Sequence, residues 1–393
     1  MHICIISAKI PPTPCGVGDH TYQLARLLVE RGVHVTLLTG QQQAASVPDP
    51  RIEVRNTIPT WGLRHSNLIV QTIRRIDPDR VLVQWVPQLY HRIGASLGLP
   101  VAAQRIYRMG IQIHVMMHEL WVVPDRPLYW ITHPIQKLAV SLFVNGSHST
   151  SVSIRQWTEL LREKFPHRRN DIHCVPVGSN IVRQNFPSRD WIRNKLQIDR
   201  DRVIIALFSP YGSARDFPLI ESVYQKMRSA PSVQWVCIGG DRARLADRLP
   251  GLSGDPHCLF TGYLENENVS LWLQASDILF APFMDGVCTR RGTIMAGLAH
   301  GLAIVTTRGR FTDLPLFSDS GMVLSERNAE ELSQRLMAWV GDPQARRAAA
   351  EESERFHRNH FTWNQIAQML FPIAGKEEVN ARRNDQLLSS RRG

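Results

Sequence analysis

The sequence predicts an α/β protein built from two doubly wound, Rossmann-like domains that face each other across a cleft. Three observations lead to this fold class. The chain has 393 residues, 43% of them hydrophobic, which suits two domain cores better than one. Short apolar runs alternate with amphipathic helical stretches throughout. The alternation starts again near residue 200, so the chain consists of two similar halves.

Buried parallel strands are predicted in both halves, because the short runs are apolar on both faces. In the first half the runs are residues 2–6, 33–38, 52–55, 81–85, 111–117, 141–144 and 172–175. In the second half they are residues 203–208, 233–238, 258–261, 278–281 and 303–306. Helical periodicity marks intervening stretches such as residues 21–30, 219–227, 269–274 and 330–339.

We expect an N-terminal domain over residues 1–180 and a C-terminal domain over residues 203–373. Residues 181–202 between them are polar and charged and contain Pro187, as a linker would. The last helix of the second domain is expected to pack back on the first. Residues 374–393 lose all periodicity, carry four arginines and are expected to form a flexible basic tail.

Composition narrows the class of protein. No run of 18 apolar residues and no secretion signal is present, so we expect a cytoplasmic chain, at most peripheral at the inner face of a membrane. The six cysteines show no zinc-site spacing. Of the formal charge of +11, residues 1–180 carry +8 and the remainder +3. A basic surface suits an anionic lipid or a phosphorylated substrate, and we expect no nucleic-acid partner.

The first strand leads into a glycine-containing loop that precedes a helix. Gly16 and Gly18 allow the backbone to approach a ligand closely, and the helix start offers free N–H groups to an anion. The loop is not a dinucleotide fingerprint, because Thr21 stands at the third glycine position and no acidic residue follows the second strand. A dehydrogenase is therefore disfavoured. An ordinary loop into a helix is the alternative interpretation.

Two other strand ends place polar residues at the predicted cleft. His118 and Glu119 follow the run 111–117, and a histidine there projects into the cleft, although a lone histidine is more often structural. The loop after the run 81–85 carries aromatic and amide groups that suit a sugar or lipid acceptor. The residues assigned to the acceptor are Gln84, Trp85, Gln88 and Tyr90. Packing explains Trp85 equally well.

The clearest anion site is predicted after the run 278–281. Arg290, Arg291, Gly292 and Thr293 combine two guanidinium groups, free N–H groups and a hydroxyl at the start of a helix. All of these groups favour negative charge, as a diphosphate would supply. A solvated arginine pair is the alternative, and the apolar residues that follow weigh against it because they bury the helix.

Several segments resemble glycosyltransferase family 4, retaining enzymes of the GT-B fold. The matching segments are residues 16–28, 31–35, 118, 175–178, 238–241, 260–263, 275–277 and 299–305. They occur in the family's order and span roughly residues 1–370. Their common order argues against chance similarity.

The resemblance implies transfer of a hexosyl-type sugar from a UDP- or GDP-linked donor to a glycan or lipid-linked acceptor. It implies retention at the anomeric carbon, no cofactor and no metal, in the synthesis of cell-surface polysaccharide or glycolipid. His118, with Asp19 and Glu119 beside the same cleft, is expected at the catalytic centre. The expected donor-binding residues are Gly16, Val17, Gly18, Ser209, Arg215, Gly262, Tyr263, Asp285, Arg290, Arg291, Gly292 and Thr293.

The chain departs from the family pattern at two places. Cys288 and Ala296 stand where the family usually has two glutamates, and the usual Arg and Lys after residues 203–208 are missing, with Arg215 as a substitute. Two alternatives therefore stay open: a sugar-nucleotide epimerase on the same fold, and a catalytically silent binding protein.

A last expectation concerns residues 154–169, which combine an apolar stripe with flanking basic residues. The apolar members are Ile154, Trp157, Leu160, Leu161 and Phe165, and the basic ones are Arg155, Arg162, Lys164, Arg168 and Arg169. Such a helix suits docking on an anionic membrane surface. The same stripe could equally pack on the sheet, as most amphipathic helices do.

Overall fold

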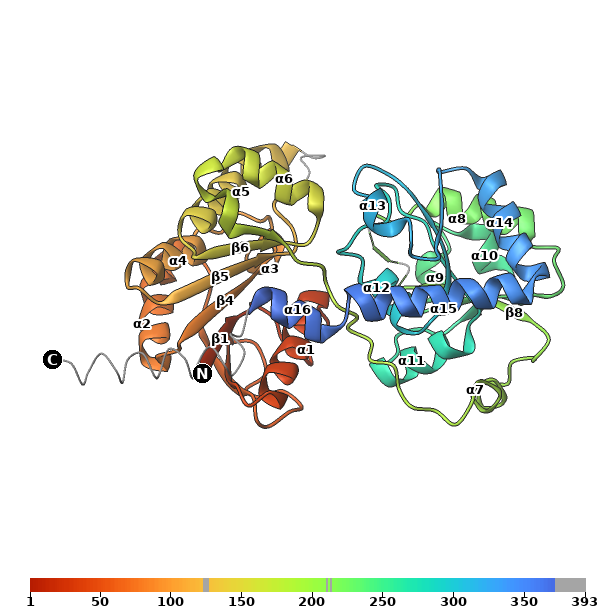
Figure 1. The fold of residues 1–393 in the computed structure, drawn as a ribbon, viewed down its shortest axis with the longest axis horizontal. Helices are drawn as coiled ribbons and strands as arrows, with labels where there is room; N and C mark the ends of the chain where they lie inside the picture. The colour runs from red at the N-terminus through yellow and green to blue at the C-terminus, as the bar shows by residue number, and fades with distance from the viewer. Residues whose placement is uncertain (123–126, 210, 213, 372–393) are drawn as a thin grey trace, which may run out of the picture.

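The structure is a computed structural model that describes residues 1–122, 127–209, 211–212 and 214–371. Two parallel sheets, each covered by helices, form two domains that lie beside each other (Figure 1). This arrangement confirms the predicted fold class. The expected tail at residues 374–393 lies outside the described residues.

The first sheet has seven parallel strands in the order β3-β2-β1-β4-β5-β6-β7. The strands are β1 (His2–Ile6), β2 (His34–Gly40), β3 (Glu53–Ile58), β4 (Arg80–Trp85), β5 (Gln112–Met117), β6 (Ser149–Val152) and β7 (Ile172–Cys174). The helices are α1 (Gly16–Glu30), α2 (Ser66–Ile76), α3 (Pro87–Tyr90), α4 (Gly98–Arg108), α5 (Pro127–Asn145) and α6 (Arg155–Lys164). The central strands are buried on both faces, as their unbroken apolar sequences require.

The second sheet has six parallel strands in the order β10-β9-β8-β11-β12-β13. The strands are β8 (Val203–Phe208), β9 (Val233–Ile238), β10 (Leu259–Phe260), β11 (Ile278–Ala281), β12 (Ala303–Thr307) and β13 (Val323–Ser325). The helices from α7 on are α7 (Arg189–Lys195), α8 (Phe217–Met227), α9 (Arg242–Leu245), α10 (Pro250–Gly254), α11 (Asn266–Ala275), α12 (Gly292–Ala299), α13 (Leu314–Phe317), α14 (Ala329–Gly341), α15 (Pro343–His360) and α16 (Trp363–Leu370).

Both sheets reverse their strand order beside their first strand, between β1 and β4 and between β8 and β11. Loops that leave the carboxyl ends of neighbouring strands diverge at such a point and open a crevice. The loops after β1, β5 and β11 carry the predicted glycines, His118 and the arginine pair, respectively. The topology therefore brings these three segments toward one place.

The predicted strand at residues 141–144 is wrong, because these residues lie within α5. Val140, Phe143 and Val144 are buried at helical spacing. The strand of this region is β6, which is rich in serine and threonine and therefore shows no apolar run in the sequence. The short β13 was not predicted either. A three-residue strand contributes too few residues for a periodic signal.

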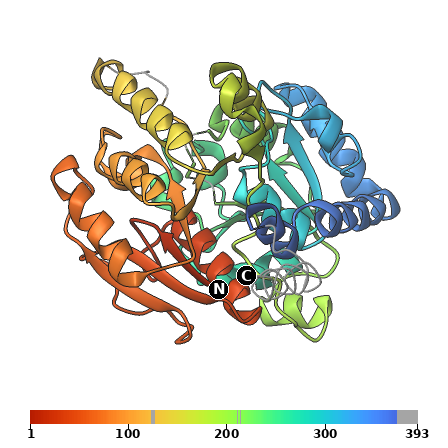
Figure 2. The same cartoon turned by 60° about the vertical axis from the view of Figure 1, so that its left-hand side comes forward.

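The C-terminal helix α16 crosses back to the first domain and lies against α1 (Figure 2). Its residues Ile366 and Leu370 are buried in the first domain's core. Trp363 donates a hydrogen bond from Nε1 to the carbonyl of Ser179 over 2.9 Å. The two crossings of the chain between the domains therefore touch each other.

Residues 181–202, expected to be a linker, belong largely to the second domain. They contain α7, and Ile192 in that helix is 2% exposed in the second domain's core. The buried isoleucines Ile181, Ile192 and Ile198 are too widely spaced among polar residues to predict a packed segment from sequence.

The apolar stripe of residues 154–169 packs inward. Ile154, Leu161 and Phe165 are at most 5% exposed, and Leu160 alone among the five is exposed. Arg162 and Arg168 donate hydrogen bonds to backbone carbonyls of the same domain. The expectation that this helix docks on a membrane is therefore wrong, since the side chains it requires are in the core.

Candidate active site

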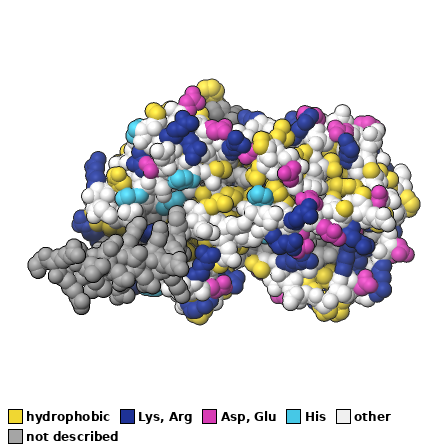
Figure 3. All heavy atoms as spheres, viewed as in Figure 1, with side chains coloured by type: hydrophobic (Ala, Val, Ile, Leu, Met, Phe, Trp, Pro, Cys, Tyr) yellow, Lys and Arg dark blue, Asp and Glu magenta, His cyan; other side chains and the backbone are white. Residues whose placement is uncertain are grey.

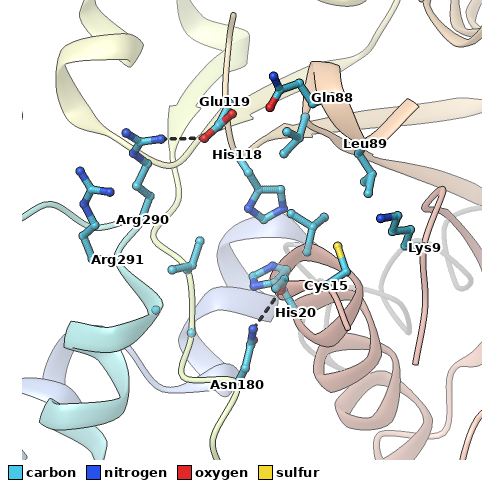
Figure 4. A pocket seen from close by; sticks show the side chains of 16 residues that line it. Lys9, Cys15, His20, Gln88, Leu89, His118, Glu119, Asn180, Arg290 and Arg291 are labelled. Carbon is cyan, nitrogen blue, oxygen red and sulfur yellow. Dashed lines mark hydrogen bonds and ion pairs between the residues drawn. The ribbon is translucent and has the colours of Figure 1, made fainter. Parts of the chain in front are cut away.

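A cavity of about 430 Å³ lies in the cleft between the two domains. The loops after β1, β4 and β5 form one wall, and the crossing segment and the start of α12 form the other. Its size is that of a small-molecule site. Figure 4 shows His118 and Glu119 on the first-domain side, opposite Arg290 and Arg291 on the second.

His118 is held rigidly at the end of β5. Its backbone N–H donates to the carbonyl of Trp85 over 2.9 Å, and its Nε2 lies 2.6 Å from Oε1 of Gln84. In this orientation of the Gln84 amide, whose Oε1 faces the ring, Nε2 carries the proton and Nδ1 is left as an acceptor. Burial lowers the pKa of His118 to about 4, so the ring is neutral near pH 7.

His20 of α1 stands edge-on to His118, with 4.8 Å between the ring centroids. It is 2% exposed, and neither of its ring nitrogens has a hydrogen-bond partner within the described residues. Burial, with a smaller contribution from His118, lowers the pKa of His20 far below its ordinary value. The first-domain wall thus presents two neutral imidazoles.

The arginine pair lies at the start of α12 and is partly paired with carboxylates. Arg290 contacts Glu119 of the first domain at 3.0 Å and Asp285 at 3.5 Å. Arg291 pairs with the other oxygen of Asp285. The Nε atoms of both arginines are buried without a partner in the described part of the chain. These unused donors, with the α12 amides, suit an anion.

Arg215 supports this loop from behind and does not line the cavity. It is 4% exposed and donates to the carbonyl of Phe208 at 2.6 Å and to Oγ1 of Thr293 at 3.0 Å. The ring of Phe283 lies between Arg215 and Arg291, 4.6 and 4.5 Å from their guanidinium carbons. Burial and then the charge of Arg291 lower the pKa of Arg215 to about 9. The prediction that Arg215 contacts the donor directly is wrong, because neighbouring residues cover its side chain.

Eight of the predicted site residues line the cavity. They are Gly16, Val17, Gln88, His118, Glu119, Arg290, Arg291 and Gly292. Each lies in a loop at a strand's carboxyl end or at a helix start. Thr293 and Asp285 lie directly behind this lining, bonded to Arg215 and to the arginine pair.

Three of the four predicted acceptor residues face the core instead. Gln84 and Trp85 are fully buried, and Tyr90 is 5% exposed and stacks on Trp85 at 5.3 Å between centroids. The strand β4 and the short α3 turn these side chains away from the cleft, which leaves Gln88 at the cavity. The acceptor assignment of Gln84, Trp85 and Tyr90 is therefore wrong.

Gly18 also lies beneath the surface. A Cβ atom there would stand 3.0 Å from the carbonyl oxygen of Lys9, so this glycine allows α1 to approach the loop after β1. Asp19 is half-buried beside the cavity, and burial raises its pKa to about 6.

The remaining predicted donor residues lie in second-domain loops outside the cavity. Ser209 follows β8 with a φ of +50°, and Gly262 follows β10 with a φ of +63°. Tyr263 is 74% exposed. Burial raises the pKa of Tyr263, the charge of Glu265 raises it further, and the charge of Asp19 across the cleft makes a third, smaller contribution. These loops border the cleft from the side of the second sheet.

Sequence reasoning missed Lys9, Cys15, His20 and Asn180, all of which line the cavity. Lys9 adds a positive charge to the first-domain wall, opposite the arginine pair, and Asn180 of the crossing segment donates to the carbonyl of Gly16 at 2.9 Å. The signal for Lys9 was its place directly after the first strand. Nothing local distinguishes His20 from its helical neighbours.

The two missing family glutamates correspond to interior positions. Cys288 is 1% exposed and Ala296 is fully buried in the second domain's core. The Asp285 carboxylate and the arginine pair instead occupy the surface of this region.

One other polar cluster lies at the amino edge of the first sheet, away from the cavity. His2, His34 and Glu53 are the group within the described residues whose potential metal ligands lie within 4.8 Å of one another. The two imidazoles stack in parallel at 4.1 Å, and Glu53 already pairs with Arg55 and Thr36.

Residues 216–342 match the family model described as Glycosyl transferases group 1. The matched segment contains the arginine pair. No curated protein sequence matches the chain.

Solved structures share the arrangement of both domains. Sucrose-phosphate synthase from Thermosynechococcus elongatus is 13% identical over 99% of this chain and 100% of its own, with a TM-score of 0.69. WaaG, a glycosyltransferase involved in lipopolysaccharide biosynthesis, is 14% identical over 95% and 100%, with a TM-score of 0.65. HepE from Anabaena in complex with UDP-glucose is 14% identical over 94% and 98%, with a TM-score of 0.68. The chain therefore has the two-domain GT-B fold.

Among the described residues, no helix has the length and apolar character needed to cross a bilayer.

Proposed function

We propose that this protein is a retaining glycosyltransferase of family 4 that moves a sugar from a UDP- or GDP-linked donor to a glycan or lipid-linked acceptor. The observation that carries the proposal is the arginine pair at the start of α12, which faces neutral His118 across the cavity between the domains. The group 1 match around this pair supports the transferase class. A similar fold binds UDP-glucose in HepE, which supports the donor class.

The reaction breaks the bond between the anomeric carbon and the diphosphate and forms a bond to an acceptor hydroxyl. The hydroxyl proton leaves to the departing diphosphate or to a nearby base. Negative charge grows on the diphosphate during this step, and Arg290, Arg291 and the α12 amides would stabilise it. We propose that these groups replace a divalent metal.

His118 would hold the donor sugar. Its Nδ1 is an acceptor, and the low pKa keeps it unprotonated near pH 7. A sugar hydroxyl can donate to this nitrogen. Asp285 and Glu119, which pair with the arginines, would give way to the diphosphate when the donor binds. The exposed ring of Tyr263 and the loops at Ser209 and Gly262 are proposed to border the nucleoside.

Calorimetric titration of UDP and of GDP into the full chain tests the donor site. Arg291→Ala should weaken binding by about 10- to 150-fold, since a hydrogen bond to a charged group contributes about 1.5–3 kcal/mol. Arg335→Ala is the matched control, because that arginine is 60% exposed on α14. Equal affinity of the Arg291 variant and the wild type would remove the assignment.

Turnover of a panel of sugar nucleotides separates the proposal from its alternatives. Transfer requires an acceptor, whereas an epimerase would convert the donor alone and a silent protein would bind without conversion. The proposed pathway, synthesis of cell-surface polysaccharide or glycolipid, would show in the acceptors used. Activity should persist in excess EDTA, and restoration by Mg²⁺ or Mn²⁺ of an activity lost in EDTA would contradict metal independence.

A further inference from the structure

The outer face of α5 is apolar and uncovered. Thr132, Gln136, Ala139 and Phe143 on its inner side are at most 1% exposed. On the outer side, four large apolar side chains are between 48% and 72% exposed: Leu128, Trp130, Ile131 and Leu138. We call these four residues the α5 face. They recur at helical spacing, so they form one stripe instead of scattered exposed residues.

The charged side chains that act on His133 of α5 are both lysines. Residues 127–145 include no Asp or Glu, and Lys137 is exposed on the same helix. Burial lowers the pKa of His133 in α5, and Lys137 and then Lys164 of α6 lower it further. Lys164 is therefore within electrostatic reach of the stripe. Residues 1–180 together carry +8, which adds to this local field.

The helix begins next to the cavity. Gln88, which lines the cavity, donates from Nε2 to the hydroxyl of Tyr129 in the first turn of α5 at 3.2 Å. Figure 2 shows α5 at the outer rim of the first domain. A surface that covers the α5 face therefore lies close to the acceptor side of the cleft.

We propose that the α5 face docks on an anionic lipid bilayer, and that the acceptor is a lipid-linked molecule presented from it. This inference rests on the proposed function and narrows its acceptor class. Leucine and isoleucine side chains enter the apolar layer, a tryptophan suits the interface, and lysines attract anionic headgroups.

Co-sedimentation of the full chain with vesicles tests the proposal. Phosphatidylcholine vesicles that contain phosphatidylglycerol should bind the wild type at low salt, and pure phosphatidylcholine vesicles should bind it much less. The double variant Trp130→Ser, Ile131→Ser should partition at least about tenfold more weakly. Trp191→Ser is the matched control, because Trp191 is 40% exposed on α7 of the second domain. The double variant Lys137→Glu, Lys164→Glu should bind anionic vesicles more weakly than the wild type, and its binding should depend less on salt concentration.

Three results would overturn the proposal. They are no binding of the wild type to anionic vesicles at low salt, equal binding of the double variant, and a dimer of the wild type that the double variant loses in sedimentation. The last result would assign the α5 face to a second copy. Unchanged melting temperatures show that the variants fold. UDP titration in parallel separates a failure of the docking proposal from a failure of the proposed transferase function, because UDP binding depends on the donor site and not on α5.

Discussion

At the scale of single residues, burial decides the chemistry of the site more than residue type does. His118 and His20 are ordinary histidines that the fold keeps neutral by excluding water. Arg290 and Arg291 form ion pairs with Asp285, and Arg290 also pairs with Glu119. The cavity therefore combines neutral acceptors for a sugar with cationic donors for a diphosphate.

His118→Ala should impair transfer while leaving UDP binding intact. If Nδ1 accepts a hydrogen bond from the donor sugar, its loss should slow transfer by about 5- to 150-fold, the range for leaving a buried group unpaired. UDP lacks the sugar, so its affinity should change little. Turnover and calorimetry on the same preparation measure both quantities. A variant with the full rate and an unchanged melting temperature would show that His118 has no role in transfer.

At the scale of elements, the site depends on how closely the two interdomain crossings approach each other. Gly178 lies against Trp363 of α16, and a Cβ atom there would stand 2.7 Å from the indole ring. Val177 beside it donates from its backbone N–H to the carbonyl of Thr289 at 3.0 Å, in the loop that carries the arginine pair. Packing of α16 thus reaches the donor site through two neighbouring residues.

Gly178→Ala should loosen α16. Overpacking of this kind costs about 1–3 kcal/mol, so the melting temperature should fall and hydrogen exchange in α16 should accelerate. Gly341→Ala is the control, because a Cβ atom at Gly341 would meet nothing within 4 Å. An equally stable Gly178 variant with unchanged exchange would show that Trp363 can move aside freely.

At the scale of the whole molecule, polar contacts hold the two domains together around the cavity. Arg290 reaches Glu119 at 3.0 Å, Arg155 reaches Asp313 at 3.2 Å, and Thr289 donates to the carbonyl of Ser153. On the face seen in Figure 3, basic and acidic side chains are interspersed over the second domain.

The structure also contains several histidines that are buried without charge, which links its stability to pH.

The free energy of unfolding should fall as the pH falls from about 6.5 to 4. Burial lowers the pKa of His118 and His300 to about 4 and that of His114 to about 3. In this window the unfolded chain takes up protons that the folded chain excludes, at up to about 1.4 kcal/mol per pH unit for each histidine. Asp19, with its pKa raised to about 6, has the opposite sign and offsets part of this slope.

Urea unfolding at a series of pH values measures this dependence. His300→Gln should reduce the slope below pH 6.5, and His91→Gln, a substitution at an exposed histidine, is the control. A midpoint that stays constant between pH 7 and 4.5 would contradict the expected contribution of the buried histidines.

Local sequence patterns were enough to predict most of the helices and strands and the loops that carry chemistry. Runs that are apolar on both faces can be stable only as covered strands, and the start of α12 at Gly292 follows directly from the local order of residues. The placement of His118 and the arginine pair at strand and helix ends then brings them to one cleft by topology alone.

Only the tertiary structure decided which side of each element faces the cavity. Tyr90 turns into the core while Gln88, two residues earlier, lines the cavity. Likewise His20 lines the cavity and faces His118, whereas Asp19, the residue before it, was the one predicted at the site. Two apolar helices show the same limit: the stripe at Leu161 is buried, whereas the stripe at Trp130 is exposed. Periodicity reveals that a helix has an apolar side, but whether that side is covered depends on elements that are distant in the chain.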